Sequence, residues 1–154
     1  AAVFYLARAL NGGEDPMFIA RRIVIQASED VGLANSEALN VAVSAMNAVH
    51  QIGMPEARII LAQAALTVAL SPKSNTSYLG INAAIEDVKN VDIGQVPMHI
   101  RNGVASGMEE FGYGVGYKYP HDFENAKVEQ QYLPDTLLCK KYFNPKSWEN
   151  FYEE

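Results

Sequence analysis

The apolar positions of this chain predict helices, because they recur three and four residues apart between breaks marked by glycine or proline. These breaks predict five helices before residue 90, at about 1–11, 16–31, 37–51, 55–70 and 75–89, and a short sixth helix at 104–111. No stretch has the two-residue alternation of a strand-rich unit. We therefore predict an all-α fold, a bundle of about six helices.

Several predicted helix ends carry a residue that suits the position. Glycines at the ends of the first three helices are typical of C-terminal caps. The fourth helix is expected to end at Ser71–Pro72, because the residue before a proline avoids helical backbone angles. The expected residues at helix N-termini are Asp15 before Pro16, Ser36 before the third helix, Pro55 at the start of the fourth, and Ser74 or Asn75 before the fifth.

The second, third and fourth predicted helices are apolar on nearly every side. On the second, only Arg22, Gln26 and Glu29 form a thin polar line. A helix of this kind packs against protein on several sides. Two explanations are open: a tight core within one chain, or a surface that meets another subunit, since large apolar patches mark interfaces. The pattern alone does not separate core from interface.

The charged residues of the second helix are candidates for structural ion pairs. Arg21 and Arg22 lie on a helix that packs on several sides, and Glu29 and Asp30 follow one to two turns later. A guanidinium group close to other protein needs a carboxylate or a carbonyl as its partner. Because structural ion pairs outnumber catalytic ones, we expect these four residues to fix the packing of the bundle or its subunit contacts.

Residues 112–154 differ in composition from the helices before them. Eleven of the fifteen aromatic residues lie at 111–154, among glycines and prolines that interrupt any long helix. We expect an irregular arm whose aromatic side chains pack on the helical bundle of residues 1–111. On this interpretation residues 1–154 form a single domain.

Composition narrows the class of protein. The chain has 154 residues and one cysteine, Cys139, so an internal disulfide is excluded and a reducing compartment, the cytoplasm, is expected. No apolar run is long enough to span a membrane, and no basic leader precedes the first helix. The net charge of −6 argues against a broad nucleic-acid surface. The chain starts without Met or a capping residue, so we expect it to be cut from a longer protein.

Motifs for catalysis or cofactor binding are incomplete. Lys73–Ser74 lacks the glycines of a phosphate-binding loop, and the glycines at 112, 114 and 116 do not fit the dinucleotide pattern. The three histidines are far apart in sequence, and the single cysteine has no partner at metal-ligand spacing. We therefore predict no catalytic, cofactor-binding or metal-binding residue, and no enzyme activity for this chain.

Five residues are weaker candidates for contact with a nucleic acid or another anion. His99 and Arg101 follow Pro97 in a predicted loop, where bonds to loop carbonyls are the commoner role of such side chains. Tyr117, Lys118 and Tyr119 combine aromatic rings with a cation, as in surfaces that stack single-stranded bases. From residue 111 onward, however, five lysines face seven acidic residues, so packing of these aromatics on the helices is favoured.

A set of sequence blocks, together in order and spacing, resembles one protein family. The blocks are FYLAR at 4–8, GGEDP at 12–16, FIARR at 18–22, SEDVGLA at 28–34, GMPEAR at 53–58, LAQA at 61–64, PKSN at 72–75, VPMHIRN at 96–102 and GYGVGYKY at 112–119. They resemble the C-terminal region of the replication-associated recombination protein A family (RarA, also called MgsA), which includes the eukaryotic Werner-helicase-interacting ATPases. The resemblance spans nearly the whole chain and fades after about Pro145.

The resemblance implies a function that the residues alone do not. It implies an oligomerisation domain similar in architecture to the collar of clamp loaders, joining protomers into a homotetramer. The family's N-terminal AAA+ ATPase, which holds ATP and magnesium and is DNA-dependent, is absent here. The parent protein is expected to act at stalled replication forks with DNA and single-strand-binding protein as partners, in the bacterial cytoplasm, associated with the nucleoid and with no membrane.

Two alternatives to oligomerisation stay open. One is a single-stranded DNA-binding module that uses Arg101, Tyr117, Lys118 and Tyr119, although this chain has Val115 where family members usually carry lysine. Salt-dependent binding to an oligonucleotide distinguishes this module from the others. The other is a monomeric helical enzyme with a small-molecule pocket, which needs a concave site with perturbed titratable groups.

Overall fold

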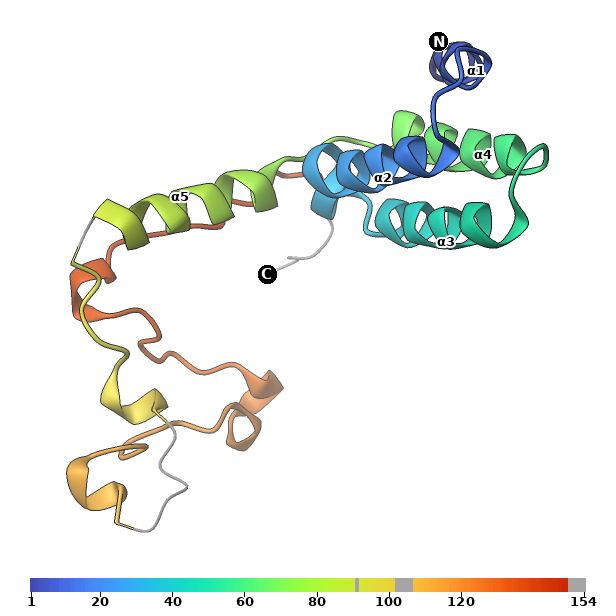
Figure 1. The fold of residues 1–154 in the computed structure, drawn as a ribbon. Helices are drawn as coiled ribbons and strands as arrows, with labels where there is room; N and C mark the ends of the chain where they lie inside the picture. The colour runs from blue at the N-terminus through green and yellow to red at the C-terminus, as the bar shows by residue number, and fades with distance from the viewer. Residues whose placement is uncertain (91, 102–106, 150–154) are drawn as a thin grey trace. The chain divides into compact units, whose positions relative to one another are not determined.

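The protein is all-α, as predicted. A computed structural model describes residues 1–90, 92–101 and 107–149, and no strand occurs in these ranges (Figure 1). Its α-helices are α1 (Ala2–Asn11), α2 (Pro16–Gln26), α3 (Glu37–Ile52), α4 (Ala57–Leu70) and α5 (Thr76–Asn90). None of these helices is long and apolar enough to cross a membrane.

The number of helices differs slightly from the prediction of about six. The sixth helix was predicted at 104–111, and residues 102–106 lie outside the described ranges. The described end of that stretch forms a single 3-10 turn, Glu109–Phe111. Further 3-10 turns are Gly32–Ala34, Met98–Ile100, Pro120–Asp122, Glu124–Ala126 and Asp135–Leu137.

The second predicted helix is confirmed in extent and in its start. Asp15 caps α2, because its carboxylate accepts hydrogen bonds from the backbone N–H groups of Met17 and Phe18, both at 3.0 Å. After α2 the chain continues as a π-helical turn, Ala27–Val31, and ends at Gly32, whose φ of +49° suits glycine. The predicted span of 16–31 therefore combines an α-helix and a π-helical turn.

Two predicted N-terminal positions are wrong by one or two residues. Asn35, not Ser36, caps α3: its side-chain oxygen accepts the N–H of Glu37 at 3.2 Å. Ser36 already has helical backbone angles, so its side chain does not take the capping position. Pro55 lies two residues before α4, in a turn closed by a hydrogen bond of 2.9 Å from the N–H of Ala57 to the carbonyl of Gly53.

The contacts divide the chain into two compact units, which we describe separately. The bundle unit consists of residues 1–82 and the described C-terminal residues 142–149, and the second unit consists of the described residues between 83 and 141. The division falls within α5 and at 141/142, and the single domain of residues 1–154 stays a prediction. The division falls there because residues 146–149 bond to residues 73–76, whereas Lys140 forms an ion pair of 2.9 Å with Asp87.

The core of the bundle unit is built largely from alanine. Helix α4 contacts α1, α2 and α3. In Figure 1, α2, α3 and α4 lie across the view, and α1 is seen nearly end-on. Of its thirteen buried apolar residues, eight are alanines: Ala20, Ala27, Ala34, Ala38, Ala42, Ala45, Ala57 and Ala64. Small side chains let helices approach closely, so the helices pack tightly while many large apolar side chains lie outside the core.

The second unit is held mainly by hydrogen bonds of its loops. Leu137 is its one buried apolar residue among those described. The backbone N–H of Gly114 donates to the carbonyl of Met98 at 3.0 Å, and that of Leu137 donates to the carbonyl of Pro134 at 2.8 Å. This unit has little apolar core of its own in the described ranges.

Candidate interaction surface

The outer face of α4 exposes large apolar side chains. Ile59, Leu66 and Leu70 are 61%, 41% and 81% exposed, and together with Gln63 they follow the spacing i, i+4, i+7, i+11 along one side of the helix. The opposite side is buried and consists of Ala57, Leu61, Ala64 and Val68. Helix α4 is therefore apolar on nearly every side, as predicted, but the line at 59, 63, 66 and 70 stays exposed within the chain. We call the exposed line at 59, 63, 66 and 70 the α4 ridge.

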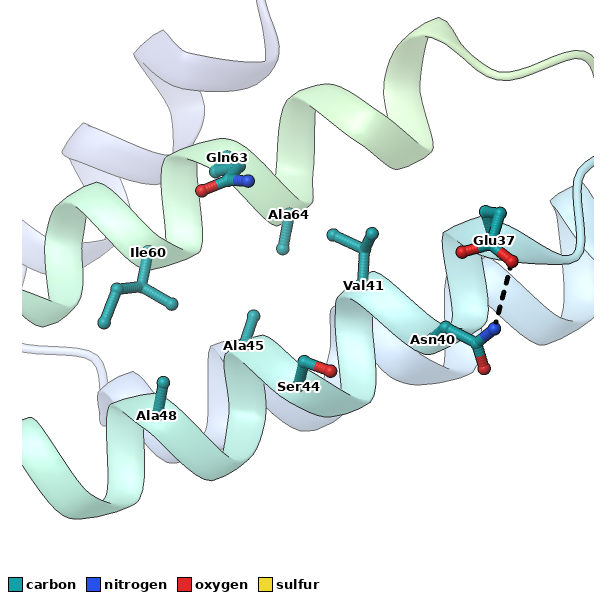
Figure 2. A pocket seen from close by; sticks show the side chains of 9 residues that line it. All are labelled: Glu37, Asn40, Val41, Ser44, Ala45, Ala48, Ile60, Gln63 and Ala64. Atoms are coloured by element: carbon teal, nitrogen blue, oxygen red, sulfur yellow. Dashed lines mark hydrogen bonds between the residues drawn. The ribbon is translucent and has the colours of Figure 1, made fainter.

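A shallow groove of about 430 Å³ lies beside the α4 ridge, between α3 and α4 (Figure 2). Helix α4 contributes Ile60, Gln63 and Ala64, and α3 lines the other wall, mostly with small side chains: Val41, Ser44, Ala45 and Ala48. At its polar end, the amide of Asn40 donates a hydrogen bond of 3.3 Å to the carboxylate of Glu37, one turn away on α3 (Figure 2).

The helical hairpin that carries this groove is nearly free of charge. Residues 37–70 include three acidic or basic residues, Glu37, Glu56 and Arg58, in a chain with a net charge of −6. Large apolar side chains on a face with few charges are typical of surfaces that contact another protein. We call this surface, the α4 ridge with the α3–α4 groove, the hairpin face.

The predicted ion-pair residues lie outside the hairpin face. Arg21 pairs with Asp15, at 3.6 Å, and both side chains are more than half exposed. Within the described residues no ion pair joins Arg21 or Arg22 to Glu29 or Asp30, which follow seven to nine positions later, ~10–14 Å along the helix. Arg22 and Glu29 are exposed, and the role of the four residues in subunit contacts stays a prediction.

A buried polar junction, which the sequence did not predict, ties the C-terminal segment to the bundle. The carboxylate of Glu149 accepts hydrogen bonds from the hydroxyls of Ser74 and Thr76, the latter at 2.5 Å, and all three residues are buried. It also accepts the N–H of Lys146 at 2.7 Å. We call this cluster the Glu149 junction. Ser74 and Glu149 are 75 residues apart, so no local sequence signal pairs them.

The Glu149 junction holds three parts of the bundle unit together. The N–H of Ser74 donates to the carbonyl of Asp30 at 2.8 Å, which joins the end of the π-helical turn to the segment before α5. The indole N–H of Trp148 donates to the carbonyl of Lys73 at 3.0 Å. The ammonium of Lys73 donates to the carbonyls of Val68, Ala69 and Ser71 and so caps the C-terminus of α4. The sequence predicted Ser74 or Asn75 as the N-terminal cap of the fifth helix; the capping seen here is that of the C-terminus of α4, by Lys73.

The hydrogen bonds of the junction determine the ionisation of Glu149. Burial alone would raise the pKa of its carboxyl group. The hydroxyls of Ser74 and Thr76, with the N–H and the charge of Lys146, outweigh burial and lower the pKa below its ordinary value of 4.5. The junction therefore holds a charged carboxylate inside the bundle unit at neutral pH.

The candidate anion-binding residues of the second unit use their polar groups within the chain. A ring nitrogen of His99 lies 2.7 Å from the carbonyl of Gln131. The guanidinium of Arg101 donates to the carbonyl of Val96 at 2.6 Å and to the side chain of Gln95 at 2.8 Å, and lies 5.6 Å from the ring centre of Tyr113. These bonds to loop groups use one ring nitrogen of His99 and part of the five N–H donors of Arg101 within the chain.

The other three candidates lie elsewhere in the same unit. The ammonium of Lys118 donates to the carbonyl of Glu129 at 2.9 Å, and its N–H donates to Gln130 at 2.7 Å. Tyr117 and Tyr119 are exposed, and the ring of Tyr119 lies 5.1 Å from that of His121. Arg101 bonds to residues 95 and 96, whereas Lys118 bonds to residues 129 and 130, so the two cations contact different loop segments of the unit. In the described ranges no three His, Cys, Asp or Glu side chains gather as a metal site would require.

Comparison with known families identifies the chain. The family model for the C-terminal region of MgsA AAA+ ATPases matches residues 1–154. The chain belongs to this MgsA C-terminal family. The resemblance drawn from the sequence blocks is therefore confirmed, and the all-helical fold is that of an MgsA C-terminal domain.

Relatives of this MgsA C-terminal domain are longer proteins. The chain is 50% identical over 145 residues to an uncharacterized AAA domain-containing protein of Mycobacterium tuberculosis, covering 94% of this chain and 32% of that protein. It is 45% identical over 151 residues to replication-associated recombination protein A of Bacillus subtilis, covering 98% of this chain and 36% of that protein. The chain thus spans about a third of the length of these relatives.

Proposed function

We propose that this MgsA C-terminal domain is a self-association module, which joins protomers of a longer AAA+ protein into a homotetramer. The observation that supports it best is the hairpin face, where large apolar side chains stand exposed on a nearly uncharged surface. Covering such side chains contributes roughly 25 cal/mol for each Å² removed from water, which favours association. The module has no catalytic residue of its own on this proposal.

The names of the relatives supply the proposed context. One relative is called replication-associated recombination protein A, and another is called an AAA domain-containing protein. By analogy, the parent of this chain is a DNA-dependent AAA+ ATPase that binds ATP and magnesium in an N-terminal domain. It acts in DNA replication, recombination and repair at stalled forks, with single-strand-binding protein, in the bacterial cytoplasm near the nucleoid. Tethering several motor units in one tetramer raises their effective concentration at a single fork.

Light scattering on the chain over a range of concentrations tests the proposal. A self-association module gives a mass of several protomers, with four as the expected limit at high concentration. A mass that stays at one protomer, 16.9 kDa, up to high micromolar concentration would contradict the proposal. Circular dichroism on the same samples checks that the chain is folded and helical.

Single-stranded DNA binding through the arm is the weaker alternative. The exposed rings of Tyr117 and Tyr119 favour it, because such rings stack on unpaired bases. The cations of Arg101 and Lys118 are bonded to loop carbonyls, which argues against it. Anisotropy of a labelled oligonucleotide at low salt tests this alternative: salt-dependent binding would support it, and no binding would eliminate it.

A further inference from the structure

We propose that residues 142–149 form a strap that opens and closes as one piece on the folded bundle unit. The carboxylate of Glu149 is the latch at one end of the strap, and the backbone at Gly80 receives the other end. Opening of the strap does not depend on the proposed self-association. Three observations lead to it: the course of the strap along α5, the kind of bonds that hold it, and a glycine inside α5.

The strap runs antiparallel to residues 73–80, beside the first turns of α5 (Figure 1). Three contacts define this direction: Tyr142 with Gly80, Lys146 with Asn75, and Trp148 with Lys73. Residue numbers thus rise along the strap while those of its partners fall. At the last described residue, Glu149 accepts hydrogen bonds from the hydroxyls of Ser74 and Thr76, which closes the strap over the start of α5.

Hydrogen bonds, rather than buried apolar side chains, hold the strap. Among residues 142–149 only Glu149 is buried, and Trp148 is 51% exposed. The buried apolar residues of the bundle unit all lie between Leu6 and Val68. Burial of apolar surface is the main favourable term in packing helices together. A segment that buries no apolar side chain therefore opens at a lower free energy than the helices unfold.

The glycine at position 80 shows how closely the strap approaches α5. Glycine in the interior of a helix is less favourable than alanine, so it commonly marks a close approach of other atoms. A Cβ atom at Gly80 would lie 2.6 Å from the carbonyl oxygen of Tyr142. This oxygen belongs to the backbone, so the strap itself would have to move to make room. Helix α5 thus has its least helix-favouring non-proline residue where the strap contacts it.

The strap anchors one of the two chain connections between the units. The chain leaves the bundle unit within α5 and returns to it at 141/142, where the strap begins. A closed strap fixes the returning chain to residues 73–80, and an open strap leaves α5 as the connection that the bundle unit still holds. The strap is therefore a conformational device that sets how firmly the chain of the second unit is anchored.

Hydrogen exchange at single amides, followed by NMR on the whole chain, tests the strap without a substitution. The N–H of Lys146 donates to the carboxylate of Glu149 at 2.7 Å, so it exchanges when the latch opens. The N–H of Leu61, within the core helix α4, exchanges when the bundle unfolds. We expect the opening constant at Lys146 to exceed that at Leu61 by about tenfold or more. Equal opening constants would overturn the proposal, because the strap would then open only together with the helices.

Gly80→Ala is the decisive variant, because it acts on the strap and on α5 in opposite directions. The added Cβ displaces the carbonyl of Tyr142, which should raise the opening constant at Lys146 about tenfold. Alanine also stabilises α5, whether the strap is open or closed, so the opening constant at Leu61 should rise only about two- to threefold. An equal rise at both amides would contradict a separate strap.

Ser77→Ala is the matched control, because Ser77 is exposed on the same helix and alanine favours the helix there too. It adds no atom beside Tyr142, so it should leave the opening constant at Lys146 unchanged. If Ser77→Ala raises that constant as much as Gly80→Ala does, the contact at Gly80 does not hold the strap. Circular dichroism confirms that both variants keep the helical fold.

Discussion

The bundle unit and the second unit differ in what holds them together. Thirteen of the fourteen buried apolar residues described lie in the bundle unit, as do the four buried polar residues, Ser71, Ser74, Thr76 and Glu149. The second unit buries Leu137 and otherwise relies on hydrogen bonds between loop groups, such as those of Arg101 and Lys118. Exposed hydrogen bonds add little net free energy, so we expect the bundle unit to be the more stable of the two.

The comparison also separates two uses of apolar residues. In the bundle unit, small residues fill the core and large ones, such as Leu66 and Leu70, stand outside it. In the second unit, the exposed Phe123 lies between two charged residues in the sequence, Asp122 and Glu124. Single exposed apolar residues are ordinary on protein surfaces, whereas an aligned set on a helix with a single charged residue is typical of an interface.

The largest effect is expected from deleting a core side chain of the bundle unit. Leu61 is fully buried at the centre of α4, so Leu61→Ala should lower the free energy of unfolding by about 4 kcal/mol, because it leaves a cavity in a tightly packed core. Leu137→Ala, in the second unit, should cost about 1 kcal/mol, since its turn has few buried neighbours to lose. Urea titration followed by circular dichroism measures both values. Equal costs would contradict the contrast between the units.

The local parts of the fold could be predicted from the sequence. The start of α2 follows from Asp15 and Pro16, and the end of α3 follows from Gly53, because each signal acts on neighbouring backbone groups. The cap of α3 was misplaced by one residue because Asn35 and Ser36 are both good capping residues. Only the backbone conformation decides between them.

Long-range features could not be predicted. The Glu149 junction joins residues 73–75 positions apart, and no periodicity connects them. Likewise, α4 is apolar on every side, so its sequence did not indicate that Leu61 faces inward and Leu66 outward. In the second unit, Arg101 and Lys118 are candidates for anion binding from the sequence. Their hydrogen bonds to the carbonyls of Val96 and Glu129 could not be predicted, because these depend on how the loops fold.

A close backbone approach inside the bundle unit gives the second effect. A Cβ atom at Gly32 would lie 2.8 Å from the carbonyl oxygen of Ser74, and the φ of Gly32 is +49°. Gly32→Ala should therefore cost about 3 kcal/mol, from backbone strain and from displacement of the Glu149 junction. Gly53→Ala is the control, because φ there is +73° but no atom lies within 4 Å of the Cβ position. It should cost about 1–2 kcal/mol. Thermal unfolding of both variants isolates the contribution of the contact.

The Glu149 junction should make the stability of the bundle unit depend on pH. Because hydrogen bonds lower the pKa of Glu149 in the folded state, its charge stabilises the fold above the ordinary value of 4.5. This contribution is lost as the pH falls through the lower folded pKa. Glu149→Gln should cost about 1–2 kcal/mol at neutral pH, and the difference from the parent chain should shrink in acid.

The exposed Glu124 of the second unit provides the control for this pH dependence. Glu124→Gln removes the same charge without a buried hydrogen bond, so it should change the midpoint of thermal unfolding little at any pH. The measurement is a series of melting curves for both variants from neutral pH to about pH 3. A Glu149→Gln variant whose deficit stays constant over that range would show that the charge of Glu149 does not stabilise the junction.

The smallest effect is expected at the start of α2, where a helix cap and a surface ion pair share one carboxylate. Asp15→Ala removes two hydrogen bonds to backbone N–H groups and should cost about 1 kcal/mol. Arg21→Ala removes only the pair of 3.6 Å between exposed side chains and should cost less than about 0.5 kcal/mol. Urea titrations at several protein concentrations separate this local effect from self-association. If Arg21→Ala lowers the free energy of unfolding as much as Asp15→Ala does, the ion pair contributes more to stability than expected for two exposed side chains. If Arg21→Ala instead weakens self-association in the parent chain, Arg21 belongs to a subunit contact, as its sequence position first indicated.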